Sequence, residues 1–126
     1  MTGTSTSLAA GIAALALLGL YAVEASAQEN RASRFAGVAT IYSADYSGAT
    51  ASGQRYDPLK LTAAHRTLPF GTRLVVTDPR TGRSVTVIVN DRGPFTKGRI
   101  LDLSWAAAKA LHVIDRGVFD IVATVE

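Results

Sequence analysis

The residues whose types could do chemistry gather at the end of an apolar run. Val87-Ile88-Val89 is followed by Asn90, Asp91 and Arg92, and then by Gly93-Pro94. The β-branched run should pair in a sheet, so the polar residues stand where a strand leaves that sheet. Asp91 therefore has two possible roles. It ties down the loop by accepting main-chain N–H groups, or it brings a carboxyl group to a place where a proton is exchanged.

Two other segments have the composition of loops but a specific choice of residues. They are TASGQRYD at 50–57 and LTAAHRTLPFGT at 61–72, and the second contains His65. An imidazole can carry a proton near neutral pH, or it can serve as a structural hydrogen-bonding group, and both readings stay open for His65. One histidine with no cysteine near it offers too few ligands for zinc. We therefore predict no metal and no cofactor.

Short strands separated by turns must position these segments. Five runs have the composition of strands: residues 38–42, 73–77, 84–89, 99–103 and 118–125. Alternation in the last run is imperfect, which predicts strands buried on both faces. Between the second and third runs, Asp78-Pro79-Arg80-Thr81-Gly82 has the residue types of a hairpin turn.

One helix is expected. Ser104 is a good N-cap residue, and residues 105–111 that follow it have high helix propensity. His112 lies at the end of this helix, where a cation meets the negative end of the dipole. Many short strands, one short helix and frequent turn residues predict a small, mostly β barrel.

The first residues read as a targeting segment. Residues 8–23 are apolar or small and carry no charge, and this run is shorter than the about 20 residues that a membrane span needs. Ala25-Ser26-Ala27 then matches a signal-peptidase site, so residues 1–27 are predicted to be a signal peptide. An uncleaved anchor is the alternative. Residues 28–36 are expected to be a flexible tail, and residues 37–126 the domain.

Charge and cysteine content limit the possible partners. After residue 27 there are thirteen basic and nine acidic residues, a net charge of +4. Export excludes the nucleic acid that such a charge would otherwise suggest, and a polymer of the cell envelope is the more natural partner. The sequence has no cysteine, so neither disulfides nor a lipid-modified cysteine are available. We expect a periplasmic monomer that is not a lipoprotein and is not stably inserted in the membrane.

Three motifs in order are similar to a known family. TASGQRYD, then LTAAHRTLPFGT, then VNDRGPF followed by GRILDLSWAAAKAL resemble the rare lipoprotein A (RlpA) family over about residues 37–126. The resemblance implies a six-stranded double-psi β-barrel. Expansins, barwin proteins and family 45 endoglucanases share that fold, but kinship of fold does not by itself establish function.

The resemblance implies a septal, endolytic lytic transglycosylase that cuts peptidoglycan glycan strands, preferably strands without stem peptides. The catalytic aspartate of the family falls on Asp91 and the histidine of its motif falls on His65, so these two are predicted to be the catalytic residues, with Asp91 as acid and base and His65 supporting it. Where the family often has glutamate, this chain has Gln54. A carboxamide forms hydrogen bonds but does not transfer a proton as a carboxyl group does.

The missing acid does not forbid this reaction. An inverting glycosidase needs a second carboxyl group to activate water, whereas a lytic transglycosylase uses the C6 hydroxyl of its own substrate as the nucleophile. Because that hydroxyl is held within the same molecule, one carboxyl group can act first as acid and then as base. Asp91 would then suffice, and its proton would require a raised pKa.

Four residues are predicted to contact substrate: Gln54, Tyr42, Ser52 and Arg92. Tyrosines can stack on sugar rings, although packing explains them equally well. Asp102 lies in a strand between two leucines and is expected to brace a loop. A non-catalytic, expansin-like module that binds glycan is the alternative function, and an envelope adaptor that needs only the barrel is a third.

Overall fold

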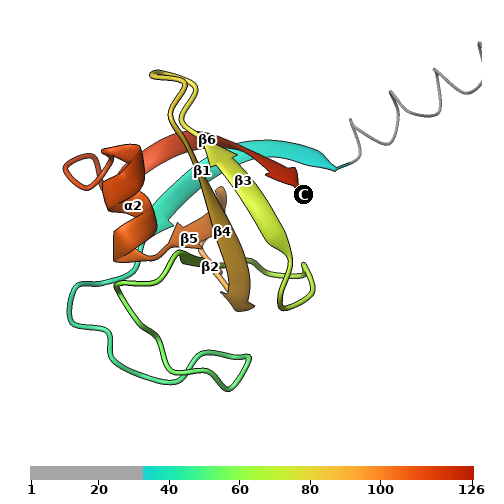
Figure 1. Ribbon diagram of the computed structural model, residues 1–126, viewed down its shortest axis with the longest axis vertical. Coiled ribbons are helices and arrows are strands. Elements are labelled where there is room, and N and C mark those ends of the chain that lie inside the picture. Colours follow the sequence, from blue (N-terminus) through green and yellow to red (C-terminus); the bar gives the residue numbers. More distant parts are fainter. Residues whose placement is uncertain (1–32) are drawn as a thin grey trace, which may run out of the picture. The chain divides into compact units, whose positions relative to one another are not determined.

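The barrel is built from six strands wound in an order that differs from their order in the chain. The computed structural model describes residues 33–126, and within them the strands follow one another around a closed barrel as β1-β5-β2-β4-β3-β6 (Figure 1). The strands are β1 (Arg34–Ile41), β2 (Thr62–Ala64), β3 (Arg73–Thr77), β4 (Ser84–Asp91), β5 (Arg99–Leu103) and β6 (Val118–Val125). The pairs β1–β5 and β2–β4 are parallel, and the others are antiparallel. For residues 33–126, the predicted mostly β, six-stranded double-psi barrel with one short helix is confirmed.

Each long strand buries one face. In β3, Leu74 and Val76 are fully buried while their neighbours are not, and the same alternation runs through β4 and β6. The expectation that strands would be buried on both faces is therefore wrong, because in a small barrel one side of each strand faces the interior and the other faces solvent or loops. Buried aliphatic residues of all six strands and of the helix form a single core cluster.

Strands β1 and β2 differ most from the sequence-based prediction. The flexible tail expected for residues 28–36 overlaps β1, since Arg34, Phe35 and Ala36 pair with the C-terminal strand β6. Strand β2 was expected to be loop. It has three residues, and it exists because β4 and β5 lie on either side of it and supply its hydrogen-bonding partners. Both differences come from pairing with distant segments, which local propensity does not record.

Helix α2 (Trp105–Leu111) begins where the sequence predicts. The Ser104 hydroxyl accepts the N–H of Ala107 at 3.2 Å and thereby caps the helix. The same hydroxyl accepts the N–H of Thr62 at 3.2 Å, so the buried cap also joins the helix to β2. The helix ends at His112, which adopts the left-handed conformation with φ 59°.

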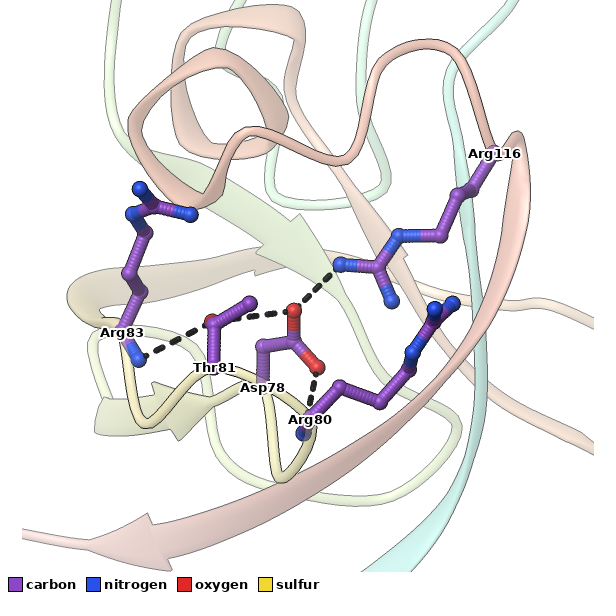
Figure 2. A network of polar contacts seen from close by, with 5 residues as sticks. All are labelled: Asp78, Arg80, Thr81, Arg83 and Arg116. Atoms are coloured by element: carbon purple, nitrogen blue, oxygen red, sulfur yellow. Dashed lines mark hydrogen bonds and ion pairs between the residues drawn. The ribbon is translucent and has the colours of Figure 1, made fainter.

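The β3–β4 hairpin is secured by a buried carboxylate (Figure 2). Asp78 is fully buried and accepts the N–H of Arg80 at 3.0 Å and the hydroxyl of Thr81 at 3.2 Å. Its other partner is the guanidinium of Arg116, from the turn that precedes β6. Chiefly because of this guanidinium, the pKa of Asp78 is held below its usual value. The ion pair therefore anchors the hairpin to the body of the barrel.

The hairpin and the long loops occupy opposite ends of the barrel. Figure 1 shows the β3–β4 turn at one end and the segment between β1 and β2 at the other. The polar motifs of the sequence lie in this second region, around the end of β4. Within residues 33–126, no helix is both long enough and apolar enough to cross a membrane. The predicted signal peptide lies outside the described residues.

Candidate active site

A β-bulge places Asp91. Strand β4 pairs with β2 so that Val89 lies opposite Ala63, but Asp91 rather than Asn90 lies opposite Ala64. One extra residue, Asn90, therefore stands in β4. A bulge of this kind re-aims the side chains that follow it. Val89 and Ala63 belong to the core, so Asp91 pairs with Ala64 on the face that turns away from the core.

A second carboxylate lies in the same row of residues, meaning residues paired side by side across adjacent strands. Ala64 also pairs with Asp102 of β5, and Asp102 pairs with Thr40 of β1. Asp91 and Asp102 are thus separated by one short strand, which puts their Cα atoms about 10 Å apart at ordinary strand spacing. The Thr40 hydroxyl donates to Oδ1 of Asp102.

Asp102 was expected only to brace a loop. Its carboxylate does bind Thr40, but it also lies one strand away from Asp91. Its neighbours in the chain, Leu101 and Leu103, are fully buried, whereas Asp102 is half-buried on the other face of β5. A signal for it was present in the sequence. A carboxylate in the middle of a short apolar strand requires polar partners, and Thr40 occupies a comparable position in β1.

The two oxygens of Asp91 have different surroundings. Oδ1 accepts two main-chain N–H groups, from Ala51 at 2.7 Å and from Arg92 at 2.8 Å. Oδ2 accepts the hydroxyl of Tyr42 at 2.6 Å. A carboxylate oxygen has two acceptor positions, so Oδ1 is filled while Oδ2 keeps one position open. The side chain is half-buried, and Oδ2 is the atom that can exchange a proton with a ligand.

Tyr42 is held as a hydrogen-bond donor. Its ring stacks on Tyr56, with centroids 4.4 Å apart and planes 8° from parallel, and Tyr46 lies against both rings. Burial, followed by the hydrogen bond to Asp91, raises the pKa of Tyr42 well above its usual value. The phenol therefore keeps its proton and cannot act as a base near neutral pH. Its position at Asp91 places this predicted substrate contact beside the carboxylate.

Arg92 turns away from Asp91. Its guanidinium donates to the carbonyl of Leu68 at 2.8 Å and to that of His65 at 3.2 Å, and it lies 4.0 Å from the centre of the Phe70 ring. Asp91 therefore receives the main-chain N–H of its neighbour but not the charge of its side chain. The side chain of Arg92, which was predicted to contact substrate, thus binds the 65–70 loop.

A second arginine makes the reciprocal contact. Nε of Arg66 donates to the carbonyl of Pro94 at 2.8 Å, and its other end donates to the carbonyl of Arg99. Each of the two loops thus sends one guanidinium onto the carbonyls of the other. Because arginine offers several donors in a rigid fork, this exchange sets the position of the loop that follows Asp91.

His65 organises its own loop. Its Nδ1 accepts the N–H groups of Thr67 and Leu68, both at 3.1 Å, so in the neutral ring the hydrogen is on Nε2. Burial, and then the nearby charges of Arg92 and Arg66, lower the pKa of His65. Its contact with Asp91 is through the main chain, where the His65 N–H donates to the Asp91 carbonyl at 3.1 Å.

Gln54 and Ser52 belong to a tight loop that lies against the bulge. The Ser52 N–H donates to the carbonyl of Asn90 at 3.3 Å, and the hydroxyls of Ser52 and Thr50 are 2.9 Å apart. The Gln54 carboxamide accepts the side-chain N–H of Asn90 at 3.3 Å. Both predicted substrate contacts are therefore near Asp91, and Gln54 reaches it through Asn90.

An open groove begins at this point. It has a volume of about 1110 Å³. Its lining includes Gln54, Asn90 and, on the outer face of β4, Thr86 and Ile88, together with residues 55–58 and 60–62. The sequence did not predict this groove, because its walls come from β3, β4 and a loop that precedes both of them.

Phe95 is a further exposed residue beside the carboxylates. Its side chain is 79 % exposed. A Cβ placed on Gly93 would lie 3.7 Å from the Phe95 ring and 4.0 Å from Oδ2 of Asp102. Gly93 has φ 127°, a conformation that favours glycine. Both distances are ordinary van der Waals contacts, so glycine is required here by its backbone conformation rather than by crowding, and the Phe95 ring and the Asp102 carboxylate both lie near Gly93.

Comparisons with known proteins agree on one family. A family model described as lytic transglycolase matches residues 34–123. The chain is 54 % identical over 87 residues to a probable endolytic peptidoglycan transglycosylase RlpA of Nostoc sp., covering 67 % of this chain and 24 % of that protein. It is 49 % identical over 88 residues to the endolytic peptidoglycan transglycosylase RlpA of Pseudomonas aeruginosa strain PAO1, covering 69 % and 26 %. The chain thus spans about a quarter of the length of these relatives.

Solved structures show the same fold. A Streptomyces papain inhibitor matches with a TM-score of 0.60 and 27 % identity, covering 73 % of this chain and 93 % of that one. An expansin of Clavibacter michiganensis in complex with cellohexaose matches with a TM-score of 0.58 and 25 % identity, covering 74 % and 50 %.

Proposed function

Since this chain belongs to the lytic transglycolase family, we propose that it cleaves the glycan strands of peptidoglycan, preferably strands without stem peptides, and leaves 1,6-anhydromuramic acid ends. The observation that carries the proposal is the hydrogen bonding of the Asp91 side chain. Its carboxylate is held by three donors, yet Oδ2 keeps one free acceptor position. Relatives of about 50 % identity bear the name of this activity.

The proposed reaction uses one carboxyl group twice. Asp91 first gives the proton on Oδ2 to the glycosidic oxygen, and the bond between C1 of the muramoyl residue and that oxygen breaks. The C6 hydroxyl of the same residue then attacks C1 and returns its proton to Oδ2. Atoms and protons balance without water. The internal nucleophile supplies the effective concentration that a separate water would lack.

Other residues of the site assist this carboxyl group. Tyr42 orients Oδ2 through its hydrogen bond, and as a phenol with a raised pKa it remains a donor throughout. Asp102, half-buried on the same row, stabilises the positive charge that develops on the sugar ring. His65 and Arg92 act as positioning residues, because their contacts hold the 65–70 loop against the loop that follows Asp91.

We assign three side chains to substrate binding: two that the sequence predicted and one that the structure shows to be exposed. Gln54 and Ser52 line the loop next to the bulge, where a carboxamide and a hydroxyl can bind sugar hydroxyls. Phe95 offers a ring face beside Asp102, and aromatic faces pack well on the apolar faces of sugars. Cleavage of this substrate requires export, so we place the protein in the periplasm after removal of residues 1–27. N-terminal sequencing of the exported protein tests that cleavage.

The decisive experiment is digestion of purified peptide-free glycan by the mature protein, with mass spectrometry of the ends. We expect 1,6-anhydromuramic acid ends from the wild type and none from Asp91→Asn. Asp78→Asn is the matched control, because it makes the same chemical change at the opposite end of the barrel. Hydrolytic ends, or anhydro ends that persist in Asp91→Asn, would contradict the mechanism.

A second function is favoured by the likeness to an expansin whose solved structure holds cellohexaose. Gln54 agrees with this function, because it stands where the family resemblance implies an acid. A module that binds glycan without cutting it would show binding of peptide-free glycan and no new ends. Gln54→Glu separates the two functions. If this change switches on cleavage in a protein that only binds, the natural protein is a binding module.

A further inference from the structure

The groove beside Asp91 contains a buried acceptor without a partner. Asn90 is 7 % exposed, and within the described residues its Oδ1 receives no hydrogen bond. Its Nδ2 is already bound to Gln54. A buried polar atom without a partner is unfavourable, so a ligand that donates a hydrogen bond to it gains affinity. Asn90 lines the groove, and a sugar hydroxyl or an amide N–H could donate to it there.

The walls of the groove carry positive charge that the protein leaves unpaired. Arg55 and Lys60 both line it and both are exposed. No salt bridge involves either residue in the described part of the chain, whereas Arg73, the third cation of the lining, pairs with Glu126 at 2.9 Å. The acid of the lining, Asp57, accepts the N–H of Leu59 at 2.9 Å. The two unpaired cations therefore make the groove attractive to anions.

Part of the lining of the groove is apolar. Ile88 is 40 % exposed and Leu61 is 43 % exposed, and both contribute to the lining. Exposed apolar side chains, an acceptor without a partner and two cations match a polymer with flat apolar faces, amide groups and carboxylates. In a peptidoglycan strand, the lactyl groups of muramoyl residues end in carboxylates only where the stem peptide has been removed.

We propose that this groove is an extension subsite that holds the glycan strand next to the cleavage point, with Arg55 and Lys60 binding the free lactyl carboxylates of peptide-free muramoyl residues and Asn90 accepting an N–H from an N-acetyl group. The proposal rests on the proposed function and deepens it. A stem peptide converts the same carboxylate into an amide and removes its charge, so these two cations favour peptide-free strands. Because both cations are exposed, the attraction weakens as salt screens it.

Binding measured without cleavage tests this subsite. The background is Asp91→Asn, which keeps the strand intact, and three ligands of equal length are compared. They are peptide-free glycan, the same glycan with its carboxylates converted to amides, and chitooligosaccharide, which has N-acetyl groups but no lactyl group. We expect the first to bind about tenfold more tightly than the other two, by calorimetry at low ionic strength.

Charge-removing variants locate the effect. Arg55→Gln with Lys60→Gln should abolish the preference for the carboxylate form and leave chitooligosaccharide binding unchanged. The matched control is Arg80→Gln with Arg83→Gln, which removes two exposed cations from the hairpin at the opposite end of the barrel (Figure 1) and should keep the preference. Asn90→Ala should weaken all three ligands alike, because all carry N-acetyl groups.

Two results would overturn the subsite. One is equal affinity of the background protein for the carboxylate and amide forms of the glycan. The other is an equal loss of preference in the groove and hairpin variants, which would indicate a general effect of net charge. Because binding is measured in Asp91→Asn, neither result depends on catalysis. A wild type that makes no anhydro ends but retains charge-dependent binding would refute the proposed activity and leave the subsite intact.

Discussion

Two aspartates at opposite ends of the barrel begin from the same local pattern and reach different environments. Asp78 follows the end of β3 and Asp91 ends β4. Each accepts the N–H of a residue just after it, Arg80 for Asp78 and Arg92 for Asp91. Asp78 is fully buried against the guanidinium of Arg116 (Figure 2), whereas Asp91 is half-buried against the hydroxyl of Tyr42.

The difference between the partners decides what each carboxylate can do. A guanidinium stabilises the ionised form, and at Asp78 it outweighs the opposing effect of burial, so the pKa of this structural anchor is low. At Asp91 the side-chain partner is the neutral hydroxyl of Tyr42, which orients the carboxyl group through one hydrogen bond. Arg92 could have supplied such a charge to Asp91, but it binds the carbonyls of the 65–70 loop instead. The two aspartates therefore differ in whether the side chain of an arginine is directed at them.

Removing the proton-exchanging group should give the largest effect. Asp91→Asn is expected to lower the rate of formation of anhydro ends by about 10³-fold, the typical worth of a positioned acid or base. Its free energy of unfolding should change by less than about 1 kcal/mol, since an amide oxygen can still accept the two N–H groups. Initial rates and urea unfolding check the two quantities. A variant that unfolds readily would make Asp91 a structural residue like Asp78.

The same substitution at the other end should reverse this pattern. Asp78→Asn breaks a buried ion pair by removing one partner, and we expect the free energy of unfolding to fall by about 3 kcal/mol. The rate per folded molecule should be unchanged, because the β3–β4 turn and the segment between β1 and β2 lie at opposite ends of the barrel (Figure 1). Urea unfolding and rates measured at low temperature separate the two effects. An inactive but stable Asp78→Asn would contradict the division of roles.

Removing the hydroxyl partner sharpens the comparison. Tyr42→Phe keeps the ring that stacks on Tyr56 but loses the donor to Asp91. A hydrogen bond to a charged group is worth about 1.5 kcal/mol, so the turnover number should fall about tenfold while KM changes little. Steady-state kinetics on peptide-free glycan measure both values. An unchanged turnover number would show that main-chain donors alone orient the carboxylate.

The smallest effect is expected from pH, through His65. Its pKa is lower in the folded protein than the usual 6.5, so at acidic pH the unfolded chain binds more protons than the folded one. Stability is complete above about pH 6.5 and is lost as pH falls toward the folded pKa. His65→Asn keeps an acceptor for the N–H groups of Thr67 and Leu68 but cannot titrate. Its Tm should fall less between pH 7 and pH 5 than that of the wild type, and an equal fall would assign the pH dependence to another group.

Much of the fold could be predicted from local patterns. Strands β3, β5 and β6 lie where β-branched runs occur, and α2 begins directly after the Ser104 cap. These elements carry their own signals, because propensity and capping act between residues close in the chain. Strand β2 carries no such signal, since its three residues are a strand only between β4 and β5.

The site could be predicted in part. The three motifs indicated Asp91, His65 and Gln54, and the structure gathers all three around the end of β4. The sequence did not indicate that Asp102 shares a row with Asp91, because that row depends on pairing through Ala64. It also could not indicate the bulge at Asn90, which is defined only when β4 lies against β2.

The sequence by itself determined where strands, turns and the helix form, and which segments carry polar side chains at strand ends. Only the tertiary structure decided which of two similar aspartates is an anchor and which is a candidate acid. The partner of Asp78 is 38 residues away in the chain and that of Asp91 is 49 residues away. The ionisation of a carboxyl group follows the charges and donors that surround it in space, and folding alone brings those groups together.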